Sequence, residues 1–166
     1  FIENTGSLNL GGGSTVTNLA NGGAISIAVR GAGNDLTISN TVSGTGAAAI
    51  TLSAADQILF TQAGTGVSSG AATVTLTAGT DIVGSAGAGN DVVAQNLVAT
   101  ATGGAIGSGN ALQTSLSGTM NLTTGGAGAA GNITVVEANA LNTANLTLTT
   151  AASVQDVSLT STAGPV

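Results

Sequence analysis

The fold is decided by residues 49–60, Ala49-Ile50-Thr51-Leu52-Ser53-Ala54-Ala55-Asp56-Gln57-Ile58-Leu59-Phe60, and by their echo at residues 73–83, Thr73-Val74-Thr75-Leu76-Thr77-Ala78-Gly79-Thr80-Asp81-Ile82-Val83. Each copy has an apolar-Thr-apolar triplet, a short polar stretch and a second apolar pair. Alternation of this kind with β-branched residues is typical of short strands that bury one face. No stretch keeps apolar residues at helical spacing, so the pattern predicts strands joined by turns.

The same pattern extends along the chain as three series of aliphatic residues with a common period of 24 to 25. The first series is Ile25, Ile50, Val74, Val98, Leu122 and Leu146. The second is Val42, Val67, Val92, Leu116, Leu141 and Val166. The third, less regular, is Leu36, Ile58, Ile82, Ile106, Ile133 and Val157. Repeats of this length indicate stacked coils, so we predict an all-β parallel β-solenoid of six to seven turns, with each series buried as a column.

Two further sets of positions follow from this stacking, in which parallel strands lie ~4.8 Å apart. The residues after the first series should form an outward column, mostly of hydroxyl side chains: Ser26, Thr51, Thr75, Ala99, Thr123 and Thr147. The residues before the third series form a column that carries three of the seven acids: Asp35, Gln57, Asp81, Ala105, Asn132 and Asp156. No two acids of this column occupy adjacent turns, which avoids repulsion between stacked carboxylates.

The amino-acid composition limits the possible folds and binding partners. The 166 residues are 42% hydrophobic, with two Phe and neither Trp nor Tyr, which fits a narrow aliphatic core. A charged fraction of 5% and a mean hydropathy of +0.47 argue against a disordered chain, because disordered segments usually have low hydrophobicity and high net charge. The net charge is −6 and Arg30 is the single basic residue, so we expect no nucleic-acid partner. There is no Cys and no apolar run of ~18 residues, so we expect no disulfide and no membrane insertion.

The repeated pattern resembles the repeats of filamentous-haemagglutinin-type adhesins and autotransporter passengers of Gram-negative bacteria. The resemblance implies a right-handed parallel β-helix, an extracellular or cell-surface location, and an adhesive or scaffolding role toward a host or neighbouring cell. It is compositional and periodic, and it carries over no binding residue. We expect residues 1–166 to form one solenoid segment of a longer repeat protein or fibre.

One motif suggests a metal. Gly31-Ala32-Gly33-Asn34-Asp35 recurs as Gly87-Ala88-Gly89-Asn90-Asp91 and resembles half of a calcium-binding nonapeptide. Calcium rolls need tandem copies because neighbouring turns share the ligands, whereas these copies lie 56 residues apart. We therefore interpret both as turns that lead into strands, and we predict no metal and no cofactor.

Surface motifs leave two binding alternatives open, ice and glycan. Thr73-Val74-Thr75-Leu76-Thr77 and Thr147-Leu148-Thr149 show the Thr-x-Thr pattern of ice-binding solenoids, but the triplets Ala24-Ser26-Ala28 and Leu97-Ala99-Ala101, expected to face outward, interrupt it. Glycan binding would be favoured by exposed aromatic side chains, which are nearly absent. Separately, Asn121, Asn132 and Asn145 each begin an Asn-x-Thr glycosylation pattern, which is also expected by chance in this composition.

Catalysis is not expected. The chain has no His, Cys or Lys, so no nucleophile–base constellation can be assembled. Two carboxylates can in principle hydrolyse a glycoside, and Asp56 and Asp81 could stack near each other, but they lack a basic partner and an aromatic platform. We therefore predict no catalytic residue and a structural role. A self-assembling subunit is the alternative, because the ends, Phe1-Ile2 and residues 162–166, lack polar caps.

Overall fold

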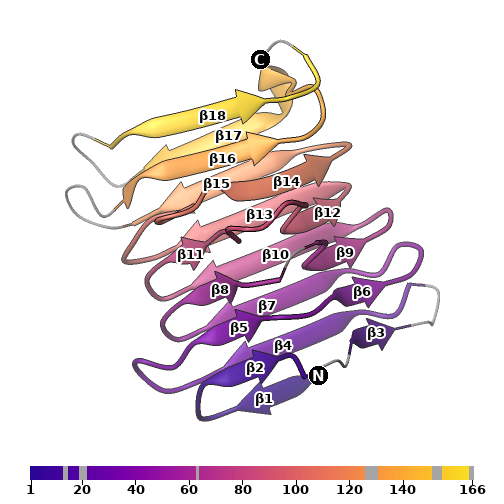
Figure 1. Cartoon of the computed structure of the whole chain (residues 1–166), viewed down its shortest axis with the longest axis vertical. Coiled ribbons are helices and arrows are strands. Elements are labelled where there is room, and N and C mark those ends of the chain that lie inside the picture. Colours follow the sequence, from indigo (N-terminus) through magenta and orange to yellow (C-terminus); the bar gives the residue numbers. More distant parts are fainter. Residues whose placement is uncertain (13–14, 19–21, 63, 126–130, 151–154, 165–166) are drawn as a thin grey trace.

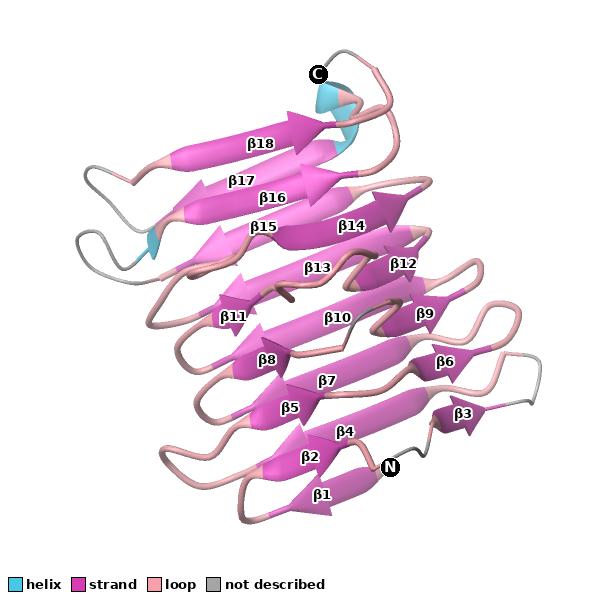
Figure 2. Ribbon diagram, viewed as in Figure 1, coloured by secondary structure: helices cyan, strands magenta, loops and turns pink. Residues whose placement is uncertain are grey.

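The chain forms a parallel β-solenoid of about six turns, shown in Figures 1 and 2. The computed structural model describes residues 1–12, 15–18, 22–62, 64–125, 131–150 and 155–164. The coils stack along the long axis from the N-terminal to the C-terminal end (Figure 1). Within the described ranges, no helix is long and apolar enough to cross a bilayer.

One long face of the coil is a seven-stranded parallel sheet, called here sheet A. Its strands, in spatial order, are β1 (Ile2–Asn4), β4 (Ile25–Val29), β7 (Ile50–Ala54), β10 (Thr73–Ala78), β13 (Asn96–Ala101), β15 (Met120–Thr124) and β17 (Leu146–Thr150). A short 3-10 helix, η2 (Thr143–Asn145), leads into β17 and is capped by the Asn142 side chain.

The opposite face consists of two parallel sheets in which most strands are shorter than those of sheet A. Sheet B contains β2 (Leu8–Leu10), β5 (Leu36–Ile38), β8 (Ile58–Phe60) and β11 (Ile82–Val83). Sheet C contains β3 (Val16–Asn18), β6 (Val42–Gly44), β9 (Val67–Ser69), β12 (Val92–Ala94), β14 (Leu112–Leu116), β16 (Ile133–Glu137) and β18 (Val157–Ser161). Strand β16 extends across the positions of both sheets on this face, because Ile133 continues the sheet B column while Glu137 pairs with Thr114 of sheet C.

The core lies between sheet A and the opposite face, and the third aliphatic series is confirmed as one of its columns. Pairing joins every member of that series in sequence, and Leu8 precedes it. The five members from Leu36 to Ile133 are completely buried. Val157, on the last coil, is 42% exposed because no described coil covers it.

The first series is wrong at two positions. Val74 pairs with Leu97, so Val98 faces outward and is half-buried. Leu122 is buried but lies in the neighbouring column, opposite Ala99. The actual column is Ile25, Ile50, Val74, Leu97, Met120 and Leu146. Two successive coils are 23 residues long, and each one-residue shortening moves a strict 24-residue series to the other face of the strand.

The second series departs from prediction in its C-terminal half. Val42, Val67 and Val92 stack as expected, but Val92 then pairs with Thr114, and Thr114 with Glu137. Leu116 instead lies opposite Ala94 and remains buried, because a shift of two residues keeps a side chain on the same face. Leu141 lies outside the strands, and Val166 lies outside the described residues.

Candidate functional site

A ladder of side chains along the edge of sheet B ties one coil to the next. The predicted column before the third series carries it: Asp35 accepts the backbone N–H of Gln57 at 3.0 Å, and Asp81 accepts that of Ala105 at 2.7 Å. Asn132 accepts the N–H of Asp156 at 3.1 Å in the same way. Acceptors on alternate coils therefore hold the backbone N–H of the next member of the column, and no two acids of the column are on adjacent coils.

The Gly-Asn-Asp motifs lead into strands of different sheets. In each, a turn leads into a strand, as predicted: Asp35 precedes β5 of sheet B and Asp91 precedes β12 of sheet C. Asn34 donates to the carbonyl oxygens of Arg30 and Thr5 at 2.8 and 3.1 Å, so its amide serves the turn. The described residues contain no group of three or more His, Cys, Asp or Glu side chains that could hold a metal ion.

Asp91 is the centre of a buried polar cluster that the sequence analysis did not anticipate. Its carboxylate is completely buried and accepts the N–H of Ser85 at 3.1 Å, the N–H of Gln113 at 2.9 Å and the Nε2 amide of Gln62 at 3.3 Å. Burial raises the pKa of Asp91 above its usual value, and the hydrogen bonds from Gln113 and Ser85 oppose the rise. One carboxylate thus connects three consecutive coils.

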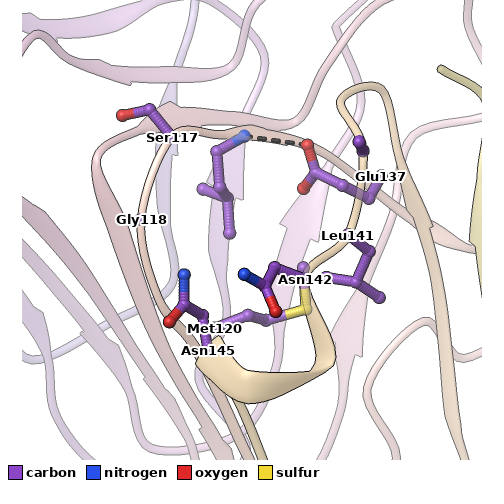
Figure 3. A pocket seen from close by; sticks show the side chains of 9 residues that line it. Ser117, Gly118, Met120, Glu137, Leu141, Asn142 and Asn145 are labelled. Atoms are coloured by element: carbon purple, nitrogen blue, oxygen red, sulfur yellow. Dashed lines mark hydrogen bonds between the residues drawn. The ribbon is translucent and has the colours of Figure 1, made fainter. Parts of the chain in front are cut away.

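Glu137 is a second buried carboxylate, near the C-terminal end. Only 2% exposed, it accepts the hydroxyl of Thr114 at 2.7 Å, the N–H of Leu116 at 2.9 Å and the N–H of Asn139 at 3.0 Å. Figure 3 shows it at the edge of a cavity of about 230 Å³, with Met120 and Asn142 among the lining residues. All of these donors come from the chain itself, so this carboxylate stabilises the coil junction.

On the outer face of sheet A, the predicted interruption of the Thr-x-Thr pattern by Leu97, Ala99 and Ala101 is wrong. Leu97, Ala99 and Ala101 are all buried and point inward. The outward column predicted after the first series is wrong at Ala99, and Thr123 faces out in the neighbouring column. Two adjacent columns are observed on this face. The first is Ser26, Thr51, Thr75, Val98, Asn121 and Thr147. The second is Ala28, Ser53, Thr77, Thr100, Thr123 and Thr149. The second of these presents hydroxyls on five consecutive coils.

The three asparagines of the Asn-x-Thr pattern occupy different environments. Asn121 is half-buried on β15, and Asn132 is engaged in the ladder. Asn145 is exposed at the end of η2 and lines the cavity of Figure 3.

Asp56 and Asp81 do not form a carboxylate pair. Asp56 accepts the hydroxyl of Thr80, the residue opposite it on the next coil, while Asp81 serves Ala105. Each carboxylate is therefore committed to a different coil junction.

No family model, curated protein or solved structure matches this chain. Architecture and side-chain chemistry alone therefore support any functional assignment.

The two ends of the solenoid differ from its sides. Among the described residues, the large apolar side chains that are exposed all lie on the first or last coil: Phe1 (80%), Ile2 (43%), Leu148 (38%) and Val157 (42%). Ile2 and Leu148 are the two ends of one core column, because Ile2 pairs with Ile27 and Leu148 with Leu122. Core columns therefore extend to both ends and remain uncovered there.

Proposed function

We propose that this chain is a structural, non-catalytic segment of an extracellular bacterial surface fibre or adhesin stalk, joined at its ends to further coils or to copies of itself. The observation that carries the proposal is the concentration of exposed large apolar side chains at the two ends. Terminal coils of a solenoid normally need a polar cap for solubility, and unpaired strand edges favour pairing with another chain.

The ladder of sheet B supports the same proposal. Inside the solenoid, Asp35, Asp81 and Asn132 each accept a backbone N–H from the following coil. Asp156 occupies the last position of that column and is exposed, and its side-chain carboxylate accepts no hydrogen bond from a described residue. An added coil would give its carboxylate the partner that the inner members already have.

Sedimentation velocity and negative-stain microscopy over a range of concentrations test this function. We expect elongated particles that lengthen with concentration at constant width. Replacing Leu148 and Val157 with Glu should stop the lengthening, because stacked coils would bury the added charges. Val98→Glu, on the outer face of sheet A, is the matched control and should leave assembly unchanged. A compact monomer at every concentration, unaffected by these substitutions, would contradict the proposal.

Ice binding is a second candidate, favoured by one observation. Hydroxyl side chains follow one another at Ser53, Thr77, Thr100, Thr123 and Thr149 on the outer face of sheet A. Val98 and Asn121 interrupt the neighbouring column, so the array is one column wide over its full length. A thermal-hysteresis measurement with the wild type and with Thr100→Lys separates the candidates: ice binding requires hysteresis that the substitution removes.

A further inference from the structure

One backbone hydrogen bond repeats at every junction along sheet B. The core residue of the column that begins with Leu8 donates its N–H to the carbonyl oxygen of the ladder residue on the following coil, as Leu8 does to Asp35. The later donor–acceptor pairs are Leu36–Gln57, Ile58–Asp81, Ile82–Ala105, Ile106–Asn132 and Ile133–Asp156. All of these bonds measure 2.9–3.0 Å. The spacing is the same at each junction although the corners differ in length, so one more coil could be added by the same rule.

The last coil presents half of this pattern beyond the C-terminal end of the solenoid. The carbonyl oxygen of Asp156 accepts the N–H of Ile133 from the coil before it. Because the C=O and N–H groups of one trans peptide point in opposite directions, the N–H of Val157 points away from the solenoid. The exposed carboxylate of Asp156 lies next to that N–H in the chain and accepts no hydrogen bond from a described residue. The C-terminal end therefore offers a backbone donor and a charged acceptor.

The first coil presents the complementary half at the N-terminal end. The N–H of Leu8 points toward the second coil, so the carbonyl oxygen of Ser7, in the same peptide group, points away from the solenoid. The N–H of Ser7 occupies a position that, on later coils, donates to a side chain of the coil before. The residues that do so are Asp35, Gln57, Ala105 and Asp156. The N-terminal end thus offers an acceptor and a donor in the places that the C-terminal end requires.

The apolar columns match at the two ends as well. Ile2 and Leu148 end one column of sheet A. Leu8 and Val157 end the column of sheet B. Placing Leu8 on Val157 also brings Leu10 onto Leu159, because each lies two residues further along its strand. Every core position of these two sheets would then meet an aliphatic side chain.

We propose that the C-terminal coil binds the N-terminal coil of a second copy of this chain, with Val157 opposite Leu8 and Leu148 opposite Ile2. The inference rests on the proposed structural role and names the partner and its register. The N–H of Val157 donates to the carbonyl oxygen of Ser7 of the second copy, and the N–H of that Ser7 donates to the Asp156 carboxylate. The contact joins unlike ends along one axis, so it repeats without closing and gives an open filament.

Engineered cysteines test this register, since the chain has no Cys of its own. In the proposed contact Thr149 of one copy lies opposite Glu3 of the next, because Glu3 pairs with Ala28 at one end of the second outer column of sheet A and Thr149 ends that column. Paired parallel strands lie ~4.8 Å apart, a Cα separation that a disulfide can span. We expect an equimolar mixture of Glu3→Cys and Thr149→Cys chains to form disulfide-linked dimers on mild oxidation.

The matched control mixes Glu3→Cys with Thr147→Cys, a position two residues earlier on the same outer face of β17. Two residues add roughly 6.6 Å along the strand, which places the two Cα atoms too far apart for a disulfide. We therefore expect no linked dimer from this mixture. Equal cross-linking of the two mixtures would overturn the proposed register. Dimers formed by Thr149→Cys alone would overturn it too, because they require a contact between like ends.

Sedimentation velocity separates this inference from the proposed function. Particles that lengthen with concentration without the expected disulfide would overturn the register and leave the structural role standing. A compact monomer at every concentration would overturn both.

Asp156 provides a second measurement that needs no cysteine. Asp156→Ala removes the acceptor for the N–H of Ser7 and should weaken end-to-end association at least about tenfold. Asp156→Asn keeps a side-chain oxygen, which is the group that Asn132 uses inside the solenoid, and should retain most of the association. Association that is equally weakened in both variants, or unchanged in both, would contradict the hydrogen bond on which the register depends.

Discussion

Val74 and Val98 are the same residue type, 24 positions apart on neighbouring coils, and they face in opposite directions. Val74 is completely buried in a core column between Ile50 and Leu97. Val98 points outward between Thr75 and Asn121 and is half-buried. A single residue lost from one coil produces this difference, because side chains alternate between faces along a strand.

The pair gives a controlled test of the core. Val74→Asp places an unpaired carboxylate among aliphatic side chains and should lower the free energy of unfolding by about 4 kcal/mol or more. Val98→Asp adds the same group on the outer face and should cost less than about 1 kcal/mol. Thermal melts followed by circular dichroism measure both. Equal destabilisation of the two variants would contradict the register of β10 and β13.

Asp91 makes the free energy of unfolding depend on pH, and the direction of the change follows from its raised pKa. Burial raises the pKa of Asp91 above the ordinary value of 3.8, so the folded chain binds this proton more tightly than the unfolded chain. Between the two pKa values, this group's contribution to stability falls as pH rises, and above both it is constant. Asp91→Asn removes that contribution, so its stability relative to the wild type should rise with pH across this window. Urea unfolding at a series of pH values measures the difference, and parallel curves would contradict it.

At the scale of elements, the sheet B ladder is the feature that joins neighbouring strands beyond their backbone pairing. Asp81 lies between β10 and β11 and holds the N–H of Ala105 on the next coil. Asp81→Ala leaves that donor without its side-chain partner and should cost about 1–2 kcal/mol. Asp156→Ala removes the same group from the last coil and should change the stability of the monomer little. Chemical denaturation of both variants provides the comparison.

The sequence predicted the strands and one complete core column, but it could not predict every column. The third series was right because its corner connections keep the inward face in register from Leu36 to Val157. The first series failed at Val98 because a shortened corner has no signature in an aliphatic pattern. The second series failed after Val92 because its column continues through two polar residues, Thr114 and Glu137. The alternation of Ile133, Val135 and Glu137 in the sequence does indicate that Glu137 faces inward.

The candidate site was less predictable than the fold. The sequence predicts a turn at the motif ending at Asp91, but the role of its carboxylate depends on Gln62 and Gln113, which lie on other coils. Residues 22 to 29 positions apart meet only because the chain coils, and their spacing follows corner lengths that the sequence alone does not reveal. Gln62 itself lies in an irregular connection without a repeating pattern.

For the whole molecule, stability is roughly a sum of coil and junction terms, and no metal contributes to that sum in our interpretation. The two Gly-Asn-Asp turns lie on different sheets, and their carboxylates accept backbone donors. We therefore expect a chelator such as EDTA to leave the β-type circular dichroism and the melting temperature unchanged. Loss of the signal with EDTA, and its return with calcium, would overturn this prediction.

The backbone pairing described above also determines how the solenoid responds to a mechanical load. All strand pairs join one coil to the next, so the hydrogen bonds of each junction lie along the axis, and the chain ends lie at opposite ends of it (Figure 1). A pull on the two ends therefore loads the terminal junctions first and peels the coils away one at a time. Each release frees roughly 24 residues, about 80 Å of extended chain. Such a segment would lengthen in near-equal steps, dissipating work at every step, where a rigid rod would break once.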